Sequence, residues 1–144
     1  MSFRINEGDL TLPKGWEDKT INAFTFPLGS KQPSASFAIT RDQLKTEITL
    51  AAYVDKQLVT LAKSCPRFEL VRRDDVSLDG IPAVQMEFTW RTPERLLVCQ
   101  EQTIVLLPAG IVLTFTATAP KDKFSIHAAA FGSLVESFRF RREG

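Results

Sequence analysis

A run without charged side chains extends over residues 102–120, nearly the length of a membrane span. A spanning helix needs about 20 consecutive apolar residues, whereas Pro108-Ala109-Gly110 interrupts this run. In the part after the interruption, β-branched residues are frequent and large apolar residues alternate with threonine. A period of two is typical of a β-strand. We therefore predict two strands, Leu96–Leu107 and Ile111–Ala119, in place of a membrane helix.

The same alternation predicts further strands elsewhere in the chain. They are Phe3–Leu12, Thr20–Leu28, a strand with Ala35, Phe37 and Ile39 on one face, Phe68–Leu78, and a strand carrying Val84, Met86, Phe88 and Trp90. Glycine, proline and aspartate supply the expected turns. They place a turn or bulge at Gly8, a hairpin loop at Ser30–Pro33 and a turn at Asp79-Gly80.

Two segments change to a helical period. Residues 49–65 place Leu50, Val54, Leu58 and Leu61 on one stripe, and Pro66 ends the segment because proline cannot donate to the backbone ladder. A second helix follows Pro120, with apolar residues spaced by three and four. The order is then three strands, a helix, four strands and a helix. It predicts one domain over residues 1–144, an α+β fold with both helices packed on one face of an antiparallel sheet.

The two faces of the predicted sheet differ in composition. One face carries large apolar residues, which we expect to meet the helices: Phe24, Phe37, Val84, Phe88, Leu113 and Phe115. The other face carries small, β-branched or amide side chains: Ile21, Ala23, Ala38, Ala83, Gln85, Val112 and Thr114. An uncharged face of this kind indicates a binding surface. A dimer interface, or a strand parity misread by one residue, is the alternative.

The long strand 96–107 does not reveal its parity. Both of its faces hold apolar and polar side chains, which leaves room for a bulge. Gln100 and Gln102 in its middle are expected to offer amide donors and acceptors on the uncharged face.

Composition narrows the class of protein. The chain is 44% hydrophobic and 24% charged, with a formal net charge of +1, which favours an ordinary globular protein over a partner of nucleic acid or anionic membranes. The first residues do not join a basic segment to an apolar one, so a secretory signal is not expected. Cys65 and Cys99 lack a paired spacing and fit reduced, partly buried thiols. The cytoplasm is the expected location.

Catalytic and metal motifs are not found in the sequence. His127 is the single histidine, and no nucleophile-elbow, zinc or phosphate-loop spacing accompanies it, so we interpret it as a partly exposed helical residue. Asp74, Asp75 and Asp79 precede a turn, where aspartate commonly caps its own backbone. We expect no enzyme activity, no metal and no cofactor.

The sequence has two basic clusters, Arg72-Arg73 and Arg139–Arg142, and clusters of this kind occur in proteins that bind nucleic acids. Acidic neighbours, among them Asp74 and Glu143, dilute both clusters. Charges on strand edges that discourage pairing with other chains explain them better. The sequence therefore does not favour a nucleic-acid partner.

A combination of segments distributed over the chain resembles a known family. The segments are Phe37–Asp42 (FAITRD), Leu78–Ala83 (LDGIPA), Gln100-Glu101-Gln102, Thr114–Ala119 (TFTATA) and Leu134–Phe138 (LVESF). Together they resemble the DcrB-like family and, within it, the effector-associated (Eag) chaperones of bacterial type VI secretion. The resemblance implies a PsbP-like α/β sandwich and a homodimer. It also implies a cytoplasmic chaperone that holds the transmembrane segments of a toxic effector, without entering a membrane itself, and helps to load that effector onto the secretion spike.

The resemblance gives the uncharged face a role, the binding of an effector. The residues that we expect to carry it are Ile21, Ala23, Ala38, Gln102 and Thr114. Small residues let a helix approach closely, and Gln102 would pair polar atoms that are costly to bury alone. The alternative is a small-ligand or envelope-associated binding domain of the same fold, with no chaperone role.

Overall fold

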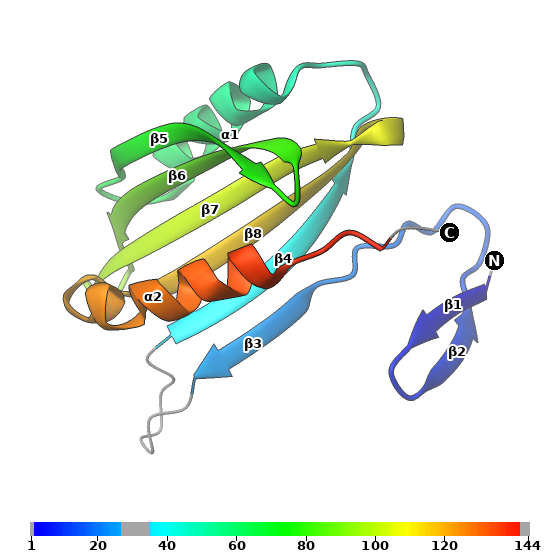
Figure 1. Cartoon of the computed structure of the whole chain (residues 1–144), viewed down its shortest axis with the longest axis horizontal. Coiled ribbons are helices and arrows are strands. Elements are labelled where there is room, and N and C mark those ends of the chain that lie inside the picture. Colours follow the sequence, from blue (N-terminus) through cyan, green and yellow to red (C-terminus); the bar gives the residue numbers. More distant parts are fainter. Residues whose placement is uncertain (1, 27–34, 142–144) are drawn as a thin grey trace.

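The computed structural model describes residues 2–26 and 35–141, which form an α+β fold with an antiparallel sheet and two long helices (Figure 1). The predicted loop Ser30–Pro33 lies outside the described residues. In chain order the elements are β1 (Ser2–Ile5), β2 (Gly8–Thr11), β3 (Asn22–Phe26), β4 (Ala35–Gln43), α1 (Leu50–Ser64), β5 (Glu69–Leu78), β6 (Ile81–Arg91), β7 (Leu97–Leu107), the 3-10 turn η1 (Pro108–Gly110), β8 (Ile111–Pro120) and α2 (Lys121–Ser137).

The main sheet has the strand order β3-β4-β8-β7-β6-β5, and all neighbouring strands are antiparallel. The charge-free run forms β7 and β8, joined by η1 as the interruption at Pro108–Gly110 predicts. The turn is fixed from outside, because the Leu44 amide donates to the Gly110 carbonyl (2.8 Å) and Gln43 Nε2 donates to the Ala109 carbonyl (2.7 Å).

The N-terminal segment differs from its prediction as one strand, Phe3–Leu12. It folds into a hairpin, β1 and β2, which pair with each other and form a separate two-stranded sheet beside the main one (Figure 1). Asn6 and Glu7 form the turn, and Gly8, where the sequence predicted a turn or bulge, is the first residue of β2.

The helices pack on opposite faces of the sheet, so the prediction that both lie on one face is wrong. Helix α1 packs on a cluster that includes Val84, Met86, Phe88, Ile104 and Val112. Helix α2 packs on the other face, where β8 contributes the residues that alternate with Val112, namely Leu113, Phe115, Ala117 and Ala119. In Figure 1 α2 lies in front of β8 and β4, and α1 lies behind β5 and β6.

Burial of β6 on both faces explains the error. Ala83, Val84, Met86 and Phe88 are all almost fully buried, although Ala83 faces the α2 side and the other three face α1. The sequence predicted that Val84 and Phe88 share a face with Leu113 and Phe115. In the structure they lie on the opposite face. Ala83 and Gln85 likewise do not belong to the uncharged face. Ala83 is part of the α2-side core. Gln85 pairs with Thr103, which pairs with Phe115, so Gln85 also faces the α2 side.

The chain after α2 completes the core on the α2 side. Phe138 packs edge-on against Phe115 at a centroid distance of 5.0 Å, and Phe140 packs against Phe138 at 4.9 Å. The Phe140 amide donates to Asp79 Oδ2 (2.9 Å) in the β5–β6 turn. This segment therefore extends the α2-side core beyond the end of the helix, with Phe138 and Phe140 packed against the buried cluster.

Replacing Phe88 by alanine tests the double burial. Phe88 is completely buried on the α1 side and stacks on Phe68 (5.1 Å), so Phe88→Ala should lower the free energy of unfolding by about 3–5 kcal/mol. Ile126→Ala is the control, because Ile126 is 73% exposed and its replacement should cost less than about 1 kcal/mol. Denaturant unfolding measures both, and similar losses would contradict the assignment of Phe88 to a second core.

Candidate functional site

The α1 side of the sheet is covered only in part. Helix α1 packs on β6 and β7 and reaches Val112 at one end of β8, whereas the remaining residues on the same side of β8, β4 and β3 do not belong to the buried cluster under α1. We call this uncovered region, with its border on β7, the open face. Its residues are exposed or half-buried, and none is charged: Ala23, Thr25, Ser36, Ala38, Thr40, Gln100, Gln102, Thr114, Thr116 and Thr118.

Strand register aligns the predicted site residues on the open face. Ala23 pairs with Ala38, Ala38 with Thr116, and Thr116 with Gln102, so one row crosses four strands. Thr114 pairs with Thr40 in the next row. Residues that are distant in sequence thus form one continuous surface of methyl, hydroxyl and amide groups.

The parity of β7 is settled by this register. β7 pairs with β6 and β8 without a shift, so no bulge interrupts it, and Gln100 and Gln102 both face the open side. The bulge lies instead in β5, between Leu70 and Arg72.

The two glutamines differ in what they bond. Gln100 Oε1 accepts from Trp90 Nε1 (3.2 Å), and Gln100 Nε2 donates to Thr118 Oγ1 (2.9 Å), which fixes the amide in place. Within the described residues, the Gln102 amide has no hydrogen-bond partner. Gln102 is therefore the amide of the open face that can bond a partner without breaking an internal hydrogen bond.

Two residues differ from the prediction of the site: Ile21 lies outside the paired strands, and Thr116 belongs to the site although it was not predicted. Ile21 precedes β3, two residues before Ala23, and its side chain is 62% exposed. Thr116 lies between Ala38 and Gln102 in the central row but was not among the predicted site residues. Its parity with Thr114 was the signal that could have identified it.

The other groups considered for chemistry lie away from the open face. His127 is 8% exposed, and its ring lies 5.3 Å from that of Phe26, so the interpretation as a partly exposed residue is wrong. Cys65 and Cys99 are free thiols, and burial raises the pKa of Cys99 to about 11. In the described parts of the chain, no group of three His, Cys, Asp or Glu side chains could hold a metal ion.

The basic pair Arg72-Arg73 is engaged by carboxylates. Arg72 lies on the α2 side, with Nη2 2.6 Å from Glu101 and Nε 3.5 Å from Glu87, and Arg73 bonds Asp55 of α1 (2.6 Å). Glu87 and Glu101 are directly opposite each other on β6 and β7. Burial raises the pKa of Glu101 and Glu87 raises it further, although Arg72 acts in the opposite direction.

Comparison with solved structures defines the class of protein as a PsbP-like α+β sandwich. The chain is similar to the cyanobacterial PsbP protein of Synechocystis, with a TM-score of 0.58 and 12% identity over 92% of this chain and 99% of that one. It is also similar to LpqN of Mycobacterium tuberculosis, with a TM-score of 0.60 and 16% identity over 86% and 85% of the two chains. At these identities the likeness shows the fold alone.

The family follows from closer matches. The DcrB family model matches residues 7–137, and the chain belongs to this family. It is 35% identical over 120 residues, 83% of each protein, to the Pseudomonas aeruginosa protein named Effector EagT6. It also resembles a Pseudomonas aeruginosa protein of unknown function, PA94, called a putative regulator, with a TM-score of 0.83 and 29% identity over 99% and 98% of the chains. None of the described helices has the length and apolar character needed to cross a membrane.

The pKa of Glu101 makes stability depend on pH. Because its folded-state pKa is raised, Glu101 stabilises the fold below its unfolded pKa of about 4, and this contribution is lost as pH rises through the folded-state pKa. Glu101→Gln keeps an oxygen acceptor for Arg72 but cannot ionise. Relative to the wild type, its free energy of unfolding should therefore increase as pH rises above the unfolded pKa of about 4.

Denaturant unfolding at several pH values checks this expectation. Glu94→Gln is the control, because Glu94 lies exposed in the β6–β7 turn and should show no such change. A relative stability of Glu101→Gln that instead falls towards pH 7 would mean that the Arg72 ion pair outweighs burial.

Proposed function

We propose that this protein is a chaperone of bacterial type VI secretion that binds the apolar transmembrane segments of an effector on its open face. The identity to Effector EagT6 supports a role in effector handling. The open face carries the proposal further. In a chain that is 24% charged, it joins four strands without one charged side chain and is not covered by either helix.

The chemistry of the open face suits an apolar helix. Each 100 Å² of apolar surface removed from water contributes about 2.5 kcal/mol, which gives the effector segment a reason to bind. Ala23 and Ala38 lie side by side and let a helix backbone come close. Gln102 and the threonine hydroxyls can pair polar groups of the segment that would be costly to bury alone.

The wider assembly belongs to the same proposal. The protein acts in the cytoplasm as a homodimer, and it reaches the secretion spike through the effector that it carries. A second copy would cover apolar side chains that stay exposed on the edge strand β3 of one chain, with Phe24 at 56% and Phe26 at 52%. Exposed apolar surface of this kind is typical of interaction sites.

A small-ligand binding domain is the alternative, and one feature favours it. Between β3 and α2 there is an apolar cavity of about 160 Å³, lined in part by Phe26, His127 and Phe131. Sites for small molecules usually measure about 300–1,000 Å³. The cavity is small by that standard, so the open face remains the better supported site.

Charges placed on the open face test the proposal. Ile21→Asp combined with Ala38→Asp puts two carboxylates where the apolar segment would lie, and burying them unpaired should weaken effector binding roughly tenfold or more. The fold should survive, because Ile21 is 62% exposed and Ala38 is half-buried. Co-expression with an effector fragment that carries its apolar segments measures binding as the fragment recovered in the soluble fraction.

A matched pair of substitutions serves as the control. Ile126→Asp with Ala128→Asp introduces the same changes on exposed positions of α2, on the opposite side of the sheet, and should leave recovery unchanged. Equal loss in both double variants would exclude the open face as the binding site. A fragment that is no more soluble with the wild-type protein than without it would refute the chaperone role.

A further inference from the structure

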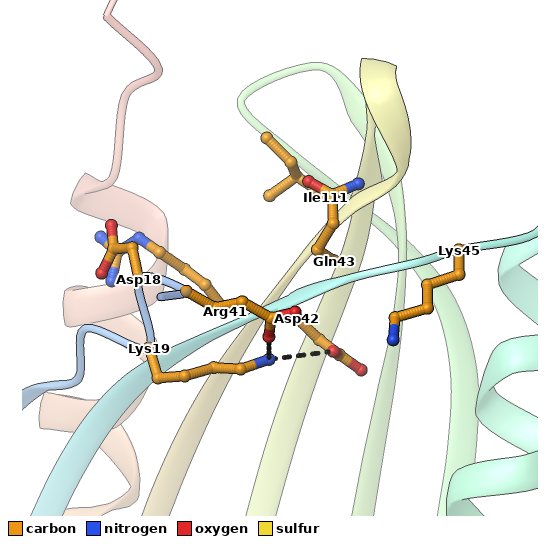
Figure 2. Close-up of a pocket in the computed structure, with 8 residues that line it drawn as sticks. Asp18, Lys19, Arg41, Asp42, Gln43, Lys45 and Ile111 are labelled. Atoms are coloured by element: carbon orange, nitrogen blue, oxygen red, sulfur yellow. Dashed lines mark ion pairs between the residues drawn. The ribbon is translucent and has the colours of Figure 1, made fainter. Parts of the chain in front are cut away.

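A charged pocket lies where the open face ends. Its volume is about 320 Å³, and its lining includes Glu17, Lys19, Arg41, Asp42 and Lys45 (Figure 2). Asp42 follows Thr40 by two residues on β4 and pairs with Val112, so it continues the line of the open face. The Tyr53 hydroxyl of α1 donates to Asp42 Oδ2 (3.3 Å). The pocket thus lies near the start of α1 and beside the segment that leads into β3.

The charges in this pocket are unevenly paired. Lys19 Nζ lies 3.4 Å from Glu17 Oε2 and 4.0 Å from Asp42 Oδ1, so one ammonium serves two carboxylates (Figure 2). Asp18 is occupied locally, because it accepts hydrogen bonds from the backbone amide and the hydroxyl of Thr20.

Among the residues that the structure describes, two cations of the pocket form no ion pair with a carboxylate. Arg41 Nη1 donates to neutral oxygens, the Thr20 carbonyl (3.2 Å) and Asn22 Oδ1 (3.0 Å). Lys45 forms no ion pair with any residue in the described parts of the chain, and its side chain points into the pocket (Figure 2). The lining carries three carboxylates and three cations, so its formal charges cancel, and Lys45 is the cation that can pair with an anionic group without giving up a partner among the described residues.

A helix bound along the open face is longer than the face, and a helix that extends past the Asp42 end reaches this pocket. From Ser36 to Asp42 the strand rises about 20 Å, whereas an apolar helix long enough to span a membrane measures about 30 Å. A helix that follows the strands must therefore pass one end of the open face. Apolar residues over the pocket would remove Lys45 from water without giving it a partner, which is costly. The polar flank of the segment fits there instead.

We propose that this pocket binds an acidic side chain directly flanking the apolar segment that the open face holds, and so fixes the position of the segment along the strands. The inference rests on the proposed function. Lys45 supplies the charge that is free to pair.

Designed segments with different flanks test the pocket apart from the open face. A soluble carrier protein is fused to a Leu/Ala segment of about 20 residues that ends in two Glu, two Ser or two Lys. Each fusion is co-expressed with the full chain, and its soluble, co-purifying fraction is measured. The Glu version should be recovered roughly threefold better than the Lys version, with the Ser version between them. Lys45→Glu should reverse this order.

The control is Lys123→Glu, an equal change of charge on an exposed residue in the first turn of α2, on the other side of the sheet. It should leave the order of the three fusions unchanged. Equal recovery of the three fusions by the wild type, or an unchanged order in Lys45→Glu, would overturn the pocket inference while the proposed function stands. Failure to retain any of the three fusions would overturn both.

Discussion

The structure depends on an imbalance in how the sheet is covered. On the α2 side, the helix and the chain that follows it close the core from Phe37 on β4 to Ala83 on β6. On the α1 side a single helix of 15 residues covers only the region around β6 and β7. Six strands side by side are wider than one helix, so part of that side must stay uncovered. The open face is a consequence of this geometry.

An uncovered half-face is usually made soluble by charged side chains, and here it is not. Each threonine on β8 exposes a methyl group and one hydroxyl, which water can satisfy in the free protein and a partner's polar group can satisfy in a complex. Lysine or glutamate at these positions would also be well hydrated, but would have to lose that hydration when an apolar partner binds. The threonine-rich composition of the open face therefore carries a small free-energy penalty both in the free protein and in the complex. Its two glutamines divide their roles, since Gln100 is held by Trp90 and Thr118 while Gln102 keeps its amide available.

The period of two was enough to predict the strands of the main sheet, and the proline positions were enough to predict where α1 ends and where α2 begins. The Thr-rich alternation of β8 and the end of α1 at Pro66 were both confirmed. What the sequence could not provide was the face of each strand relative to its neighbours, because β6 is apolar on both sides and either parity satisfies its pattern. Because we assumed that one face of the sheet is buried and the other is exposed to solvent, we predicted both helices on the same side. The N-terminal hairpin was missed for a different reason, since Asn6-Glu7 makes a turn without proline or glycine.

The placement of Ala23, Ala38, Gln102 and Thr114 on one face was correct despite that error, because these positions depend on the registers of β3, β4, β8 and β7 and not on β6. The charged pocket was beyond sequence reasoning, since residues 17–19 meet Asp42 and Lys45 only through the path of the chain into β3. The two features complement each other physically. An uncharged surface gives an apolar segment affinity but no preferred position, because sliding along it changes the buried area little. A charged boundary adds a position, because an ion pair is gained or lost over a few ångström.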